Sequence, residues 1–240
     1  MWEITLIGDK YDLSNFYTII KTIFSHENSV FASFGFGERN TLKIGVNDKN
    51  IINNVKNEII KAIITINKQE YMINNIDAIN NQNNVNDFVL QSIVMLGIDE
   101  EIEYARSKLK LSRVVHIRSL VRFRLSKIYA LWDKLIYYIN DYICGDNVYD
   151  KLLKFIASNV DCGSDVVFVN FNSCGITVCN IGGKVLGHFF DCDVYDIIIS
   201  ILMMSPKKII VQLISCESNN YCDVVTKLEY VFADRIGYVM

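Results

Sequence analysis

The sequence predicts an α+β protein with an N-terminal α/β unit, a central helical segment that includes one long helix, and a C-terminal mixed β-sheet with covering helices. Three observations lead to this prediction. Residues 1–98 alternate between strand-like and helix-like hydrophobic spacing, whereas residues 99–160 keep helical spacing throughout. Residues 161–240 return to short β-branched runs separated by glycine and asparagine turns.

The N-terminal unit is expected to change between strand and helix several times. Trp2 to Ile7 alternates as a strand does, and the apolar residues from Leu13 to Phe24 then follow a helical spacing. Asp48 precedes an apolar helical run and is expected to cap it. An asparagine-rich loop is expected at residues 80–86. The predicted strand, helix, two strands and helix cover residues 2–7, 13–24, 29–37, 41–46 and 48–66.

The central segment is expected to be helical because it lacks helix-breaking residues. Ser112 to Ile143 contains neither proline nor glycine, which predicts one long helix. Gly145 is the expected C-cap, and a shorter helix is predicted at residues 148–158. We expect this central segment to pack with residues 161–240 as one domain.

The C-terminal segment is expected to form the mixed sheet. Gly182 and Gly183 supply a tight turn, and Asp193 is expected to cap a helix. The strand–helix–strand order near the end of the chain predicts that the last two strands run parallel. The predicted hairpin, third strand, helix, strand, helix and final strand cover residues 166–171, 176–181, 184–189, 194–204, 208–213, 220–233 and 236–239.

Composition favours a cytoplasmic globular protein. The net charge of −3 does not point to a polyanion or an acidic membrane surface. The apolar stretches fall short of the roughly 18–20 residues that a membrane helix needs. Trp2 to Ile7 predicts a strand where a signal peptide would carry an apolar helical run. The seven cysteines are an odd number, and we expect them to be reduced thiols.

Three segments in the second half of the chain resemble a known family. They are Ser119 to Leu125, Val148 to Ile156, and Asp196 to Ile210, which contains the sequence Ser205-Pro206-Lys207-Lys208. Their order and spacing resemble the YtxC-like family of sporulation proteins from spore-forming bacteria, over residues 112–240. The resemblance implies a cytoplasmic role in sporulation and brings no established enzymatic activity with it.

A basic block is the most unusual local feature. It contains no acidic residue and consists of Arg106, Lys108, Lys110, Arg113, Arg118, Arg122, Arg124 and Lys127. Such a block can contact nucleic acid or an acidic partner, and it can equally be a solvated helix face with local ion pairs. In one continuous helix Arg118 and Arg122 would share a face, with Arg113 and Lys127 nearly opposite. The contact hypothesis assigns Lys108, Lys110, Arg113, Arg118, Arg122 and Lys127 to the binding surface.

Arg124 has a separate interpretation within this block. In a continuous helix it projects into the apolar arc, where an unpaired guanidinium is very unfavourable. We therefore expect a buried ion pair, with Asp133 or an acid of the C-terminal sheet as the partner. The alternative is that Arg124 binds the anionic group of a ligand.

No catalytic residue, metal ligand or cofactor site is predicted. The sequence lacks a Cys-x-x-Cys pair, and its only local grouping of ligand types is His188, Asp191, Cys192 and Asp193. A strand end followed by a helix N-cap explains that grouping equally well. Cys192 with His188 is also the only neighbouring thiol and base, and nothing else supports a nucleophile there.

Aromatic residues cover much of the central segment. They are Tyr129, Trp132, Tyr137, Tyr138 and Tyr142, and they favour core packing, with self-association or partner docking as the alternative. Taken together, the sequence favours a non-enzymatic cytoplasmic protein that acts in sporulation through contacts with an unknown protein partner. The alternatives are a nucleic-acid-binding module that uses residues 106–127 and an enzyme of unknown class.

Overall fold

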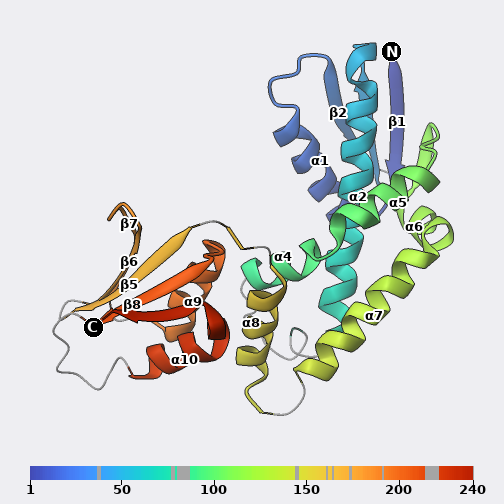
Figure 1. Ribbon diagram of the computed structural model, residues 1–240. Coiled ribbons are helices and arrows are strands. Elements are labelled where there is room, and N and C mark those ends of the chain that lie inside the picture. The colour runs from blue at the N-terminus through green and yellow to red at the C-terminus, as the bar shows by residue number, and fades with distance from the viewer. Residues whose placement is uncertain are drawn as a thin grey trace. The chain divides into compact units, whose positions relative to one another are not determined.

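The computed structural model confirms the α+β class. It describes residues 1–36, 39–76, 79, 87–143, 146–160, 162–163, 165–172, 175–190, 192–213 and 222–239 (Figure 1). The chain forms two compact units, each built from two stretches: unit 1 from residues 1–75 and 97–136, and unit 2 from residues 76–96 and 137–240. This division differs from the three consecutive segments that we expected, because the central helical segment is shared between the units.

Unit 1 contains a four-stranded sheet in the order β2-β3-β1-β4. The strands are β1 (Trp2–Ile7), β2 (Val30–Gly35), β3 (Thr41–Val46) and β4 (Val114–His116). β3 pairs antiparallel with β1 and β2, whereas β4 pairs parallel with β1. Alternate residues of β1 and β3, such as Ile4, Leu6, Leu42 and Ile44, are fully buried. One face of this sheet therefore forms the core of unit 1.

Helices cover the buried side of unit 1. They are α1 (Lys10–Ile23), α2 (Ile52–Asn75), α5 (Ile98–Lys108) and α6 (Ile117–Arg124). α1 contacts β2, β3 and α2, and α2 also contacts α5 and α6. The predicted cap is confirmed: the Asp48 carboxylate accepts a hydrogen bond from the backbone N–H of Asn50 at 2.9 Å. This cap begins a short 3₁₀ turn (Lys49–Ile51) that leads into α2.

The prediction of one long helix from Ser112 to Ile143 is wrong. The segment contains β4, then α6, and then α7 (Ser126–Tyr142), with a break at Leu125. The backbone N–H of Thr5 donates to the carbonyl of Arg113 at 2.8 Å, and Val115 is buried. The β-branched Val114 and Val115 therefore form an edge strand of the sheet and not part of a helix. This strand supplies hydrogen-bond partners to the backbone groups along the edge of β1.

Unit 2 contains a five-stranded sheet in the order β7-β6-β5-β8-β9. The strands are β5 (Val166–Asn172), β6 (Gly175–Asn180), β7 (Val185–Phe189), β8 (Lys208–Leu213) and β9 (Ile236–Val239). β5, β6 and β7 form an antiparallel meander, and β5, β8 and β9 run parallel. The predicted hairpin, third strand and parallel final pair are confirmed.

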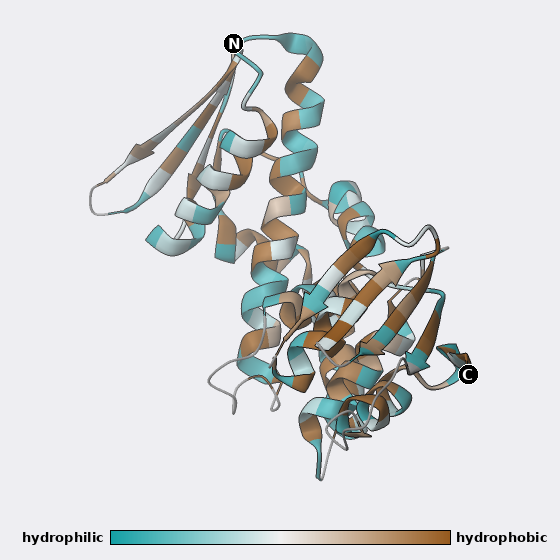
Figure 2. Ribbon diagram, turned by 90° about the vertical axis from the view of Figure 1, so that its left-hand side faces the viewer, coloured by the Kyte–Doolittle hydropathy of each residue, from teal (hydrophilic) through white to brown (hydrophobic). Residues whose placement is uncertain are grey.

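The helices of unit 2 are α4 (Asp87–Met95), α8 (Val148–Asn159), α9 (Val194–Met203) and α10 (Cys222–Phe232). α10 contacts α8 and α9, and α4 contacts the same two helices. The predicted cap of α9 is confirmed, because the Asp193 carboxylate accepts from the backbone N–H of Tyr195 at 2.8 Å. Hydrophobic and hydrophilic residues alternate along the strands, as expected for sheets with one buried face (Figure 2).

Some sequence predictions fall outside the described residues. These are the asparagine-rich loop at residues 80–86, the C-cap at Gly145, and Asp191 of the grouping of possible metal ligands around His188. Within the described part of the chain, no helix is both long enough and apolar enough to cross a membrane.

Candidate functional site

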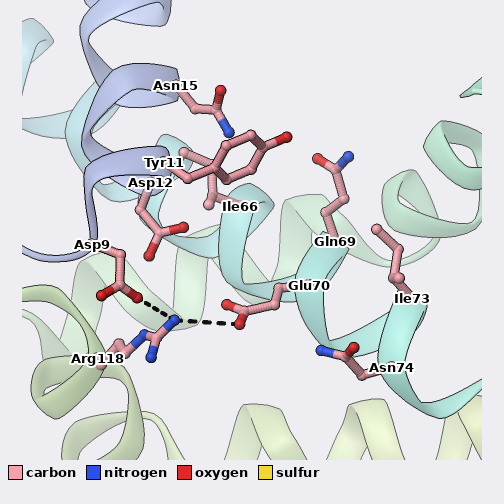
Figure 3. A pocket seen from close by; sticks show the side chains of 10 residues that line it. All are labelled: Asp9, Tyr11, Asp12, Asn15, Ile66, Gln69, Glu70, Ile73, Asn74 and Arg118. Atoms are coloured by element: carbon pink, nitrogen blue, oxygen red, sulfur yellow. Dashed lines mark hydrogen bonds and ion pairs between the residues drawn. The ribbon is translucent and has the colours of Figure 1, made fainter.

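A cleft in unit 1 brings several polar and charged side chains together. It lies between the first turns of α1, the polar face of α2 and the start of α6 (Figure 3). It consists of two hollows of about 300 Å³ each, which share Glu70, Asn74 and Arg118. The first is also lined by Asp9, Tyr11, Asp12, Asn15, Ile66, Gln69 and Ile73. The second is also lined by Asn67, Tyr71, Arg122 and Tyr129.

Arg118 links two walls of this cleft. Its Nη2 forms an ion pair with Asp9 and lies 3.5 Å from Oε1 of Glu70. The sheet brings these groups together: β1 and β4 run parallel with Ile7 opposite His116, and Asp9 and Arg118 each follow by two residues. The guanidinium side chain is 61% exposed, so each pair contributes at most about 1 kcal/mol to stability.

Asp12 is the buried acid of the cleft. Only 8% of the residue is exposed, and its carboxyl forms no hydrogen bond or ion pair with any described residue. Burial raises the pKa of this carboxyl, the neighbouring charges of Glu70 and Asp9 raise it further, and Arg118 opposes them. The Asp12 carboxyl therefore opens on the first hollow, where a ligand could reach it.

An aromatic cluster borders the second hollow. The rings of Tyr71, Tyr129 and Trp132 have centroids 5.0–5.5 Å apart. The Tyr71 hydroxyl donates to Oδ1 of Asp133 at 2.6 Å, and this hydrogen bond is the main reason that the pKa of Tyr71 rises to about 12. The core-packing interpretation is confirmed for Trp132, which is fully buried.

The expected buried ion pair of Arg124 is wrong. Arg124 is exposed and forms no ion pair with a described residue. Asp133, one of its expected partners, is hydrogen-bonded to Tyr71 instead. The break at Leu125 explains the error, because Leu125 and Ile128 take the buried positions and the helix face turns Arg124 outward.

The other basic residues also face solvent. Lys108, Lys110, Arg113, Arg118, Arg122 and Lys127 are all exposed, as is Arg106. Among the described residues, Arg118 is the one member of the block that forms an ion pair. Phe123 lies between Arg122 and Arg124 and is 79% exposed. We call residues 106–127 the basic segment.

The net charge of the whole chain conceals a strong asymmetry between the units. Unit 1 has 17 basic and 13 acidic residues, a net charge of +4, whereas unit 2 has seven basic and 14 acidic residues, a net charge of −7. The basic segment lies entirely in unit 1. The composition of the full chain was therefore a poor guide to the charge around this segment.

A buried ion pair joins α2 and α5 in the core of unit 1. Nζ of Lys68 lies 2.8 Å from Oε1 of Glu101, with both side chains buried. Burial lowers the pKa of Lys68 and raises the pKa of Glu101, and each partner opposes the shift of the other. Our sequence reasoning missed this pair. The helical spacing did indicate that Lys68 is buried, because it lies four residues from both Ile64 and Met72, which are buried on the same helix face.

A second polar cluster lies in unit 2. Lys227 of α10 forms an ion pair with Asp150 of α8 and lies 3.2 Å from the hydroxyl of Tyr195 on α9. Its ammonium also lies 5.1 Å from the centre of the Tyr195 ring. The cluster joins three helices, and sequence reasoning gave no indication of it because the residues lie far apart in the chain.

The grouping around His188 includes Asp191, which lies outside the described part of the chain. Within that part, no three His, Cys, Asp or Glu side chains are placed to hold a metal ion. Nδ1 of His188 lies 2.8 Å from the Thr177 hydroxyl, and the Cys192 thiol donates to the carbonyl of Phe190. Asp193 caps α9, as expected. The four described cysteines, at positions 162, 179, 192 and 222, are free thiols.

Comparison of the chain with protein-family models, curated proteins and solved structures gives no match.

Proposed function

We propose that unit 1 binds single-stranded nucleic acid through the basic segment. The observation that carries this proposal is the placement of Phe123, an exposed aromatic side chain between the exposed Arg122 and Arg124. Single strands are bound by basic residues that follow the phosphates and by aromatic rings on which bases stack. The segment offers both groups at adjacent positions.

The charges around the segment support the same proposal. No acidic residue occurs from residue 104 to residue 132, so basic side chains in this stretch meet no acid of their own segment. Most of them also lack an ion-pair partner among the described residues. When exposed cations without partners contact a phosphate backbone, they displace counterions from the nucleic acid. The release of these counterions drives binding.

The test is fluorescence anisotropy of the full chain with labelled single-stranded DNA and RNA, at several salt concentrations. We expect binding at low salt that weakens steeply as salt rises. The variant Arg122→Glu/Arg124→Glu/Lys127→Glu removes three contacts and should reduce the slope of log K against log[salt] by about 2. Arg118 is left unchanged because a glutamate there would face Asp9 and Glu70.

A matched control reverses two exposed lysines of unit 2. Lys184→Glu/Lys207→Glu lowers the net charge by 4, against 6 in the segment variant, without touching the basic segment, and it should leave binding nearly unchanged. Phe123→Ala should weaken binding to single strands by about 1–3 kcal/mol while preserving the salt slope. Absence of binding at low salt, or equal losses in the segment and control variants, would contradict the proposal.

We also propose a cytoplasmic role in sporulation through a protein contact. The resemblance of residues 112–240 to YtxC-like proteins supports it, and so does a second exposed aromatic group. Tyr137 is 74% exposed and Tyr138 is 55% exposed on α7, as is typical of docking surfaces. A deletion strain that forms heat-resistant spores in normal numbers would count against the sporulation role.

A further inference from the structure

We propose that the first hollow of the cleft is a binding site for an organic cation, an ammonium or guanidinium group on a short aliphatic stem, with Asp12 as its counter-ion. This inference is independent of nucleic-acid binding, because it rests on different residues of unit 1.

The position of Asp12 favours a cationic ligand. The residue as a whole is 8% exposed, and its carboxyl lines the hollow without a hydrogen-bond or ion-pair partner among the described residues. A partly desolvated carboxylate interacts more strongly with a charge than one in bulk water does, so a ligand that supplies N–H groups and positive charge is favoured there. The carboxyl faces the same space as Asp9 and Glu70 (Figure 3).

The rest of the hollow fits the head and stem of such a ligand. Asp9, Asp12 and Glu70 supply three carboxylates against one guanidinium, that of Arg118. Arg118 already shows that Asp9 and Glu70 accept a guanidinium at the mouth, and Asp12 is not part of that ion pair.

Neutral groups complete the wall. Asn15, Gln69 and Asn74 offer amide oxygens that can accept N–H groups, and Ile66 and Ile73 offer apolar surface for methylene groups. The volume of about 300 Å³ suits a small molecule. A metal ion does not fit, because the acids do not converge as a metal-binding group among the described residues.

Proton linkage gives the site a distinctive pH dependence. Burial holds the pKa of Asp12 above its ordinary value of 3.8. The charged groups that face it are Asp9 before α1, Glu70 on α2 and Arg118 on α6. A cation binds the carboxylate form, so affinity should fall as pH is lowered through the Asp12 pKa.

The experiment is isothermal titration calorimetry of the full chain, without nucleic acid, using agmatine and butylamine as probes and 1-butanol as the neutral control. We expect one site for the amines and none for the alcohol. Asp12→Asn keeps the shape of the side chain and should weaken amine binding at least tenfold. It should also abolish the pH dependence. Asp99→Asn, an exposed acid of unit 1 outside the hollow, is the matched control and should bind as the wild type does.

Thermal unfolding of each variant shows whether it remains folded. Unchanged amine affinity in a folded Asp12→Asn variant would overturn the proposal. So would an absence of amine binding in the wild type, or equal binding of the neutral alcohol.

Discussion

Asp9 and Arg118 form an ion pair because each lies two residues beyond a partnered position on neighbouring parallel strands. Ile7 of β1 stands opposite His116 of β4, and both strands end at the same edge of the sheet. The chain then enters α1 on one side and α6 on the other, so the two side chains meet over α2, where Glu70 joins them. One short strand therefore builds the mouth of the cleft.

Removal of this ion pair should have a small effect on stability. Arg118→Gln should lower the free energy of unfolding by less than about 1 kcal/mol, because the side chain is largely exposed. Arg118→Glu should cost more, since it adds a fourth carboxylate beside Asp9, Asp12 and Glu70. Urea unfolding at low and high salt distinguishes these outcomes, and added salt should reduce the loss in Arg118→Glu. Equal stability of the two variants at low salt would contradict this account.

The buried Lys68–Glu101 pair should behave in the opposite way. Lys68→Met leaves Glu101 buried without its ion-pair partner and should destabilise unit 1 by about 3–5 kcal/mol. The double variant Lys68→Met/Glu101→Leu removes both desolvated charges and should be close to wild-type stability. Urea unfolding of the two single variants and the double variant forms a double-mutant cycle. A loss in the double variant equal to the sum of the two single losses would show that the pair has no coupling.

Asp12 should destabilise the folded state at neutral pH. Its pKa is raised in the folded protein, so the folded state holds its proton to higher pH than the unfolded chain does. Its contribution to stability is present below the ordinary pKa of 3.8 and is lost as pH rises through the folded pKa.

Asp12→Asn should therefore be more stable than the wild type at pH 7, and the difference should disappear below pH 3.8. Unfolding free energies from pH 3 to pH 8 measure this, with Asp99→Asn as the control. A variant less stable than the wild type at pH 7 would mean that the carboxylate has a stabilising partner.

Tyr71 should give unit 1 a dependence on alkaline pH. Its folded pKa is raised to about 12 from 10.0, so its contribution is present below pH 10.0 and lost as pH rises through 12. Tyr71→Phe removes the hydrogen bond to Asp133 and should cost about 1 kcal/mol at pH 8. The difference from the wild type should shrink toward pH 12. A difference that stays constant across this range would exclude the hydrogen bond as its source.

Gly175 should be intolerant of any side chain. Its φ is +131°, and an added Cβ would overlap the carbonyl oxygen of Phe189 on the neighbouring strand. Gly175→Ala should destabilise unit 2 by about 3 kcal/mol, since it combines backbone strain with a clash between strands. Gly183→Ala is the matched control. The φ of Gly183 is +77° and no atom lies within 4 Å of an added Cβ, so backbone strain alone should lower the free energy of unfolding by about 1 kcal/mol. Similar losses in both variants would contradict the clash.

The sequence by itself determined the elements whose signals are local. The alternation of β1 and β3 and the caps at Asp48 and Asp193 depend on neighbours within a few residues, and all were predicted. The basic segment could also be recognised from the order of residues alone, because its lack of acids is a property of the sequence.

Only the tertiary structure decided how these elements combine. β4 is three residues long and forms because it can pair with the open edge of β1. No pattern within the residues of β4 predicts this pairing. That strand interrupted the expected helix and placed Arg118 beside Asp9, and the break at Leu125 left Arg124 exposed. The Lys68–Glu101 pair joins residues 33 apart. Local hydrogen bonds and hydrophobic spacing depend on residues close together in the sequence. Strand pairing and buried charge contacts depend on which distant segments pack together.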